Sequence, residues 1–492
     1  MHALIRYSLV VFTGIMSLLV VSCDKEAPVV SSSTGKVHLY PDYSDVTIPV
    51  NIAPMNFNIL DTADGYHVHL YGDHDDGFVI RSGSGKITIP EKKWKALLSQ
   101  CKGGRLITDV YLRRGELWFK NESVINNVAT VSIDSYLAYR LIEPGFETWN
   151  KMGIYQRNLE NFDESPVMIN EMSDGNCMNC HSFSDHSSET MLFHSRAQHA
   201  GTIIARNGKV VKVDTKTDST LSAGVYPSWH PGGRYVAFSL NHIVQSFHAI
   251  TDRKVEVIDT LSDLILYDAE KNCVIKYPEL SSPRSYETFP SWSPDGRFLY
   301  FCSATYHNYK DFQQTRYDLM RIAFDAATEK FGKIDTVIPA SRNGYSISFP
   351  RVSPDGKYLL FCKTRYGNFT IWHDDADLVL LDLTTGKTVV PEVNSNKTES
   401  YHTWSSNGRW IVFSSRRTDG LYTRLYFSYF DNAGNFHKPF LLPQKDPLYN
   451  TSLLKSYNVP ELVTSRINLE PRMLAPVIRS EAVNATYRKS EK

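Results

Sequence analysis

Beyond its first 22 residues, this 492-residue chain lacks any apolar run near the roughly 20 residues that a membrane-spanning helix needs. It also lacks a charge excess, with 53 Lys and Arg against 53 Asp and Glu. That balance argues against a nucleic-acid partner, which usually requires a basic surplus. Cysteine is scarce, with seven in the chain, and the spacing of four of them, Cys101, Cys273, Cys302 and Cys362, suggests no disulfide framework. The chain carries no G-x-S-x-G elbow and no Walker A loop, which disfavours a hydrolase or a nucleotide-binding enzyme.

The first residues predict export. A short basic region ends at Arg6, and an apolar run of the length of a secretory signal follows from about Leu9. The run ends in "VVSC", which resembles the lipobox of bacterial lipoproteins and implies lipidation of Cys23; the alternative is a plain signal peptide. We therefore expect a signal peptide over 1–22 and a tether over 23–36. The predicted location is the bacterial cell envelope, lipid-anchored to a membrane, on the outer membrane or facing the periplasm.

A repeat organises the second half of the chain. Each copy has an aromatic residue, a Trp or Val anchor, a tight turn and an alternating apolar strand, and Asp-Gly or Asn-Gly suits turns that need positive φ. The copies are "YPSWHPGGRYVAFS" (226–239), "FPSWSPDGRFLYFC" (289–302), "FPRVSPDGKYLLFC" (349–362) and "YHTWSSNGRWIVFS" (401–414). A second strand pair follows each copy, so the repeat predicts four strands per unit, which is a propeller blade.

This repeat resembles the WD40-like β-propeller repeat of TolB-type proteins and of the propellers in prolyl-oligopeptidase-type enzymes. The resemblance implies a propeller of five or six four-stranded blades over 201–465, closed by strands from both ends. The strand-like stretch 201–217 is expected to supply part of another blade. Cys302 and Cys362 fall at one repeat position, which predicts buried structural thiols.

The loops of this propeller are the expected binding surface. The turns inside the hairpins are short, whereas the other connections are long and should share the opposite face. Loops gathered on one face of a rigid scaffold commonly carry binding. We therefore expect a protein or glycan partner there, contacted by Tyr286, Tyr345, His373, Tyr401, Arg416 and Arg417.

The remaining segments complete an all-β fold class. Short alternating strands with turn signals predict a β-sandwich-like domain over 37–145. The mixed composition of 146–200 predicts a connecting segment of short helices and packed loops, and 466–492 is expected to be a C-terminal tail. The order "YRLIEPG", "YQRNLENF", "CMNCHSF", "MLFHSR" and then a propeller is similar to a group of Gram-negative lipoproteins labelled TolB-like.

One motif in that connecting segment carries chemistry. "DGNCMNCHSF" (174–183) contains C-x-x-C-H, the order that attaches haem in c-type cytochromes. In that interpretation Cys177 and Cys180 form thioethers and His181 is the proximal ligand, with Met191 or His194 as the expected sixth ligand. The alternatives are a structural disulfide or redox pair with no cofactor, and a zinc site that includes His181 and His194.

These observations lead to two functional hypotheses. The first is a membrane-anchored protein with haem c that acts in electron transfer or redox sensing while its propeller docks a partner. The second is a non-enzymatic TolB-like scaffold that binds protein or glycan at the cell envelope, with the two motif cysteines purely structural.

Overall fold

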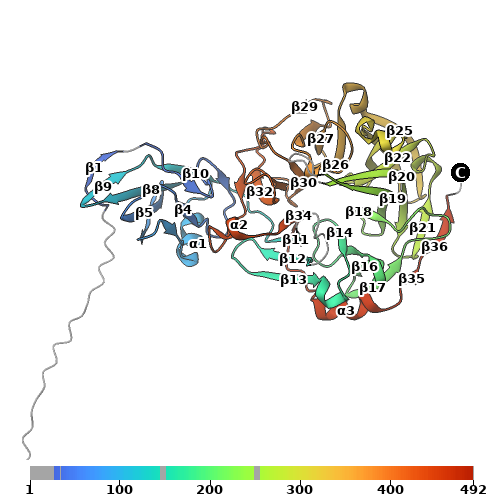
Figure 1. The fold of residues 1–492 in the computed structure, drawn as a ribbon, viewed down its shortest axis with the longest axis horizontal. Coiled ribbons are helices and arrows are strands. Elements are labelled where there is room, and N and C mark those ends of the chain that lie inside the picture. Colours follow the sequence, from blue (N-terminus) through green and yellow to red (C-terminus); the bar gives the residue numbers. More distant parts are fainter. Residues whose placement is uncertain (1–26, 34, 144–150, 249–254, 491–492) are drawn as a thin grey trace, which may run out of the picture.

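The computed structural model describes residues 27–33, 35–143, 151–248 and 255–490, and it consists of a β domain packed beside a β-propeller (Figure 1). The expected signal peptide, the lipidated Cys23 and residues 24–26 lie outside the described residues, whereas Val30–Ser33 of the expected tether form a strand of the N-terminal domain. Within the described ranges, no helix is long and apolar enough to cross a membrane.

The N-terminal domain has two sheets and one helix. Its seven-stranded sheet comprises β1 (Val30–Ser33), β3 (Thr47–Ile48), β5 (Gly65–Gly72), β6 (Asp75–Ser82), β8 (Arg105–Arg114), β9 (Leu117–Lys120) and β10 (Val124–Val128). The smaller sheet comprises β2 (Leu39–Tyr40), β4 (Phe57–Ile59) and β7 (Lys86–Ile87). The helix α1 (Glu91–Gln100) corrects the prediction of strands alone. It buries Trp94, Leu97 and Leu98, whose spacing places them on one helical face.

The propeller has six blades of four strands among the described residues, all antiparallel. Blade one contains β34 (Ser456–Val463), β11 (Tyr136–Ile142), β12 (Gly153–Asn158) and β13 (Glu164–Ile169); blade two contains β14 (Met178–Phe183), β15 (Met191–Ser195), β16 (Gly201–Arg206) and β17 (Lys209–Asp214); blade three contains β18 (Val225–Trp229), β19 (Tyr235–Phe247), β20 (Val255–Asp268) and β21 (Cys273–Lys276). Blade four contains β22 (Ser285–Trp292), β23 (Phe298–Thr305), β24 (Asp318–Asp325) and β25 (Lys330–Ile338); blade five contains β26 (Ser346–Val352), β27 (Tyr358–Thr364), β28 (Asp377–Asp382) and β29 (Thr388–Val389); blade six contains β30 (Glu399–Trp404), β31 (Trp410–Ser415), β32 (Arg424–Tyr429) and β33 (Phe440–Leu441). The prediction of a propeller of five or six four-stranded blades is confirmed, and 201–217 supplies two strands as expected.

The repeat motif has a clear structural role. Gly296 and Gly356 have φ of 70° and 71°, so the tight turns do adopt the left-handed backbone that the Asp-Gly pairs predict. Two of the anchors also link adjacent blades. The Trp292 indole donates to the Ser228 carbonyl, and the Trp404 indole to the Arg351 carbonyl, both at 3.1 Å. Each of these tryptophans therefore ties its blade to the inner strand of the preceding one.

The ring closes through strands from distant parts of the chain. Blade one takes its inner strand β34 from near the C-terminus and its other three strands from 136–169. The chain beyond β34 forms α3 (Pro471–Arg479), β35 (Val483–Asn484) and β36 (Thr486–Lys489). The last two strands extend the outer edges of blades two and three, in parallel with β17 and β21. The expected tail is thus part of the propeller.

The structure also corrects the interpretation of 146–200 as a connecting segment of helices and loops. This stretch supplies β12 and β13 to blade one and β14 and β15 to blade two. The strands escaped the sequence analysis because several polar residues in them are buried. Gln156, for example, is 2% exposed and exchanges two hydrogen bonds with the Ile467 backbone, so burial there does not follow hydrophobic alternation.

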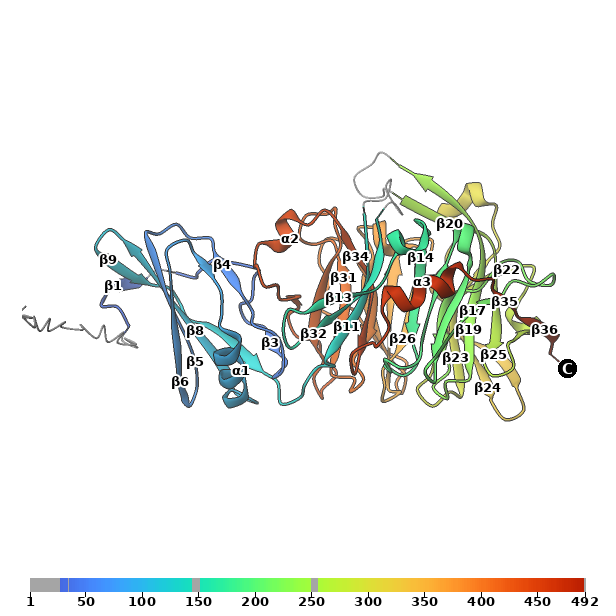
Figure 2. The same cartoon turned by 90° about the horizontal axis from the view of Figure 1, so that it is seen from below.

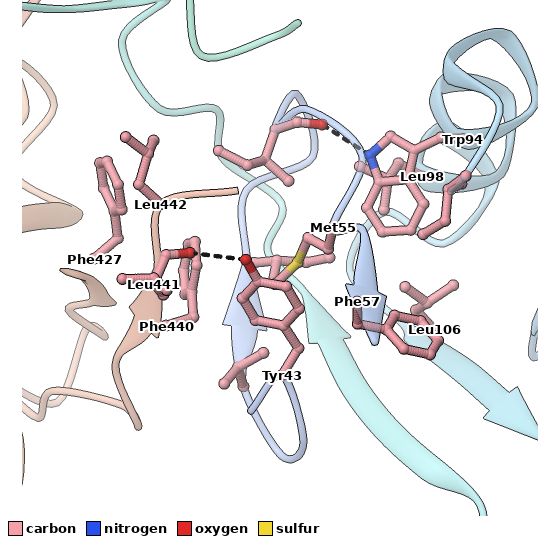
Figure 3. Packing of buried hydrophobic residues seen from close by; sticks show 14 of the residues in the cluster. Tyr43, Met55, Phe57, Trp94, Leu98, Leu106, Phe427, Phe440, Leu441 and Leu442 are labelled. Atoms are coloured by element: carbon pink, nitrogen blue, oxygen red, sulfur yellow. Dashed lines mark hydrogen bonds between the residues drawn. The ribbon is translucent and has the colours of Figure 1, made fainter. Parts of the chain in front are cut away.

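The N-terminal domain and the propeller share a hydrophobic core (Figure 3). The Tyr43 hydroxyl donates to the Leu441 carbonyl at 3.2 Å, and Met55 belongs to the same buried cluster as Phe427 and Phe440 of blade six. α2 (Tyr449–Ser452) lies on the same side of the ring, next to the N-terminal domain in Figure 1. The two units are therefore packed as one body through apolar contacts.

Candidate functional site

A left-handed residue interrupts the inner strand of every blade. The six residues share φ between 47° and 54°, and each lies at a register shift where its strand bulges against its neighbour. They are Val459, Cys180, Tyr226, Phe289, Phe349 and Tyr401, in the order of blades one to six. All six side chains line one cavity of about 190 Å³ at the propeller axis, where the inner strands meet in Figure 1.

Four of these six residues form a continuous aromatic arc. Ring centroids lie 4.5 Å apart between Tyr226 and Phe289, 4.1 Å between Phe289 and Phe349, and 4.8 Å between Phe349 and Tyr401. The arc ends at blades one and two, where Val459 and Cys180 are smaller. The cavity therefore has an aromatic side and, opposite to it, a side with a thiol.

The C-x-x-C-H motif lies at this opening, and all three of its defining residues line the cavity. Cys177 directly precedes β14, Cys180 is the bulge residue and His181 follows it. His181 is 3% exposed, and its Nε2 has no hydrogen-bond partner among the described residues. Burial lowers the pKa of His181 to about 3, with Arg140 contributing, so the imidazole is neutral at physiological pH. The thiols of Cys177 and Cys180 are not joined in a disulfide.

The expected sixth ligands do not reach the cavity. Met191 and His194 lie on β15, the second strand of blade two, and neither lines the cavity. Met191 is 1% exposed and belongs to a hydrophobic cluster of blades one and two. His194 occupies the repeat position of Ser239 and Cys362, which hydrogen-bond to the inner strand of the next blade. The prediction chose these residues because they follow the motif closely in sequence. The second strand of a blade, however, lies outside the inner strand and farther from the propeller axis.

The structure does not bring together His181 and His194, the two predicted zinc ligands. His181 lines the cavity, whereas His194 faces Thr202 on β16 at 3.4 Å between Nδ1 and Oγ1. Within the described parts of the chain, no group of three or more His, Cys, Asp or Glu side chains could hold a metal ion.

Arginines from several blades surround the motif. Arg140 of β11, Arg196 directly after β15 and Arg416 directly after β31 all line the cavity, and Arg351 of β26 lines it as well. None of the four forms an ion pair with a carboxylate in the described residues. Two carboxylates, Glu143 and Glu461, share the lining. Burial raises the pKa of Glu461 to about 7, which reduces the negative charge there near neutral pH.

A long hairpin covers part of the cavity. β19 and β20 of blade three are 13 and 14 residues long, and they project beyond the propeller disc in Figure 2. Val255 and Val257 of β20 line the cavity, whereas Glu256 between them is buried on the other side. Its carboxylate accepts from the Tyr366 hydroxyl at 2.6 Å and pairs with His373 Nε2 at 3.0 Å. Contacts from blade five therefore hold the blade-three hairpin over the cavity.

The six expected binding-face residues separate into two groups. Tyr401 and Arg416 line the cavity. The other four have structural contacts elsewhere: Tyr286 is 1% exposed, Tyr345 lies under the Lys363 ammonium, His373 pairs with Glu256, and Arg417 pairs with Glu399. The cavity does open among the long connections that the sequence placed on one face.

Sequence reasoning missed Arg140 and Arg196. The repeat contains a signal for Arg196. His194 pairs with Asn179 in blade two as Ser414 pairs with Ser400 in blade six. Arg196 and Arg416 each follow two residues later, so they occupy the same repeat position. This signal becomes visible only when "MLFHSR" is aligned as a blade strand. Arg140 lies on a strand of blade one whose partner strand comes from 456–463, and no local pattern reveals that pairing.

Comparison with known proteins finds no family for the chain, and the similar solved structures are distant. No family model matches the chain, and no curated protein matches it. Among solved structures, similar ones include a nidogen/laminin complex (8% identity, TM-score 0.34, 67% of this chain and 100% of that chain) and the Dos1 propeller (14%, 0.33, 55% and 66%). Prolyl oligopeptidase B from Galerina marginata is similar at 11% identity and TM-score 0.36, over 64% of this chain and 42% of that chain. The assignment of a propeller therefore rests on the strand topology described above.

Proposed function

We propose that the chain is an electron-transfer or redox-sensing protein that carries a c-type haem at the propeller axis. The observation that supports this most is the convergence of Cys177, Cys180 and His181 on one cavity. The buried and unpartnered Nε2 of a neutral His181 is the ligand atom that such a haem requires. His67 Nε2 and His402 Nδ1 are likewise buried without a partner among the described residues, so the support comes from the position of His181 beside the two thiols and not from its free nitrogen alone.

Different residues of the motif would attach the haem and bind its iron. Cys177 and Cys180 would each add an S–H group across one vinyl C=C bond, which forms a C–S and a C–H bond and releases nothing. His181 would hold the iron, and the group so held would exchange single electrons. The remaining cavity-lining side chains with sulfur or imidazole are Met152 and His402. His402 Nε2 is engaged with the Leu360 carbonyl at 2.9 Å.

Haem attachment is tested by producing the full chain in bacterial cells with and without haem-ligation machinery. We expect a covalent haem stain and a reduced pyridine spectrum of c-type haem only with the machinery. The variant Cys177→Ser/Cys180→Ser should abolish the stain, whereas Cys302→Ser, at a fully buried thiol in blade four, should leave it intact. Absence of covalent haem from the wild type would refute the proposal and favour the scaffold hypothesis.

We also propose that the chain is a TolB-like lipoprotein of the bacterial cell envelope, anchored through Cys23, whose propeller docks a protein or glycan. The signal-like N-terminus and the "VVSC" sequence support this. Radiolabelled palmitate should label the wild type and not Cys23→Ala, with Cys101→Ala as the matched control for loss of a cysteine. Equal labelling of all three proteins would contradict the lipid anchor.

A further inference from the structure

Three arginines from three blades lie around the C-x-x-C-H motif, and none of them forms an ion pair with a carboxylate among the described residues. Arg140 comes from blade one, Arg196 from blade two and Arg416 from blade six, and each lines the axial cavity. The charges of Arg140 and Arg196 both act on the Cys177 thiol, and those of Arg140 and Arg416 both act on Tyr401. All three arginines therefore belong to the lining of one cavity.

The hydrogen bonds of these side chains leave donors unused. Arg140 donates through Nη1 to the Met178 carbonyl at 3.2 Å, while its buried Nε has no partner in the described residues. The guanidinium of Arg196 makes no hydrogen bond or ion pair with any described residue, although its backbone N–H donates to the Cys177 carbonyl. Unpaired cationic donors in a partly buried site are costly unless a ligand satisfies them.

Arg416 is the most rigidly held of the three. It is 2% exposed, its Nε donates to the Ile371 carbonyl at 2.6 Å, and its Nη1 donates to the Leu421 carbonyl. Its guanidinium carbon lies 3.2 Å from the centre of the Trp372 ring. These contacts fix its plane beside Tyr401, so the charge is presented in one orientation.

We propose that Arg140, Arg196 and Arg416 form a binding site for the carboxylate groups of an anionic ligand in the channel. The inference deepens the proposed function, because it concerns the same cavity. Arginine guanidinium groups pair bidentately with carboxylates, and the aromatic arc in the same cavity offers an apolar surface for the rest of the ligand. Two sources supply this chemistry: the two propionates of a haem attached at the motif, or a free dicarboxylate.

The first arm of the test uses the full-length Cys177→Ser/Cys180→Ser variant, which cannot attach haem. Succinate and the neutral succinamide are titrated by calorimetry at low salt. We expect succinate to bind and succinamide not to bind. In this background, Arg196→Gln and Arg140→Gln should each weaken succinate binding about tenfold or more, since the lost hydrogen bonds involve charged partners. Arg297→Gln is the matched control, because Arg297 is 77% exposed and lies outside the cavity.

The second arm uses the wild-type chain with haem attached. If the propionates occupy the arginines, the holoprotein should no longer bind succinate, and Arg196→Gln should shift its reduction midpoint while the haem-to-protein ratio stays at the wild-type value. If a free anion is the ligand, the holoprotein should still bind succinate. The proposal is overturned if neither arm shows an effect of Arg140→Gln or Arg196→Gln beyond that of Arg297→Gln. A wild type without haem would refute only the proposed function, because the first arm does not depend on haem.

Discussion

At the scale of single residues, one repeat position takes different side chains for different purposes. The bulge residue of each inner strand is aromatic in blades three to six, and a cysteine in blade two. The following residue is proline in four blades and histidine in two, His181 and His402. The same left-handed bulge therefore places aromatic rings on one side of the cavity and the C-x-x-C-H motif on the other.

Glu287 of β22 gives a prediction at the residue scale. It is 3% exposed, and burial raises its pKa from an ordinary 4.5 to about 7. A raised carboxyl pKa favours the native state below about pH 4.5, and this contribution to stability is lost as pH rises through about 7. The increase in the pKa corresponds to about 3 kcal/mol of unfolding free energy. Glu287→Gln should therefore be more stable than the wild type at pH 8 by up to about this amount, with the difference shrinking toward pH 4.5.

Urea unfolding of both proteins between pH 4 and pH 8 measures this difference. Glu279→Gln, an exposed glutamate near the same blade, is the control and should track the wild type at every pH. A pH-independent difference between Glu287→Gln and the wild type would mean that Glu287 does not titrate in this range.

At the scale of elements, the β19–β20 hairpin covers part of the axial cavity. Its valines face the cavity, and a second set of polar contacts holds its other side. Asp259 of β20 accepts hydrogen bonds from Tyr317 at 2.7 Å and from Asn368 at 2.6 Å. The hairpin is therefore fastened to blades four and five, the two blades that follow its own around the ring.

Removing Glu256 should loosen this fastening. Glu256→Ala leaves His373 and the Tyr366 hydroxyl buried without their carboxylate, and breaking a buried pair of this kind costs about 3–5 kcal/mol. Hydrogen exchange measured by mass spectrometry should rise over Val255–Asp268 before it rises in the other blades. The control Glu270→Ala, at the exposed opposite end of the hairpin, should leave the exchange of this segment near the wild-type rate. Uniform loss of protection over all blades would argue against a locally fastened hairpin.

At the scale of the whole molecule, the ring depends on one strand from near the C-terminus. β34 pairs with β11 and provides the inner strand of blade one, including the bulge residue Val459. Without it, β11 would expose an unpaired edge toward the channel. The outer strands β35 and β36 only lengthen edges that are already complete.

Two truncations test this view. A chain ending at Leu453 lacks β34 and should lose cooperative thermal unfolding and aggregate, because the ring cannot close. A chain ending at Ser480 lacks only β35, β36 and the residues after them, so it should remain monodisperse and unfold cooperatively at a modestly lower temperature. Size-exclusion chromatography and circular dichroism distinguish these outcomes. A cooperative melt of the shorter chain would show that closure by β34 is dispensable.

The sequence alone determined the repeating part of the fold. Tight turns, tryptophan anchors and alternating strands are local signals, so blades three to six could be predicted from residues 226–465 and the burial of Cys302 and Cys362 was expected. Only the tertiary structure decided where the motif lies. Its strand pairs with residues outside the repeat, blade one joins segments more than 300 residues apart, and polar residues such as Gln156 are buried by specific hydrogen bonds. For the same reason Met191 and His194 were placed wrongly, while Arg140 and Arg196 meet the motif only once the ring has closed.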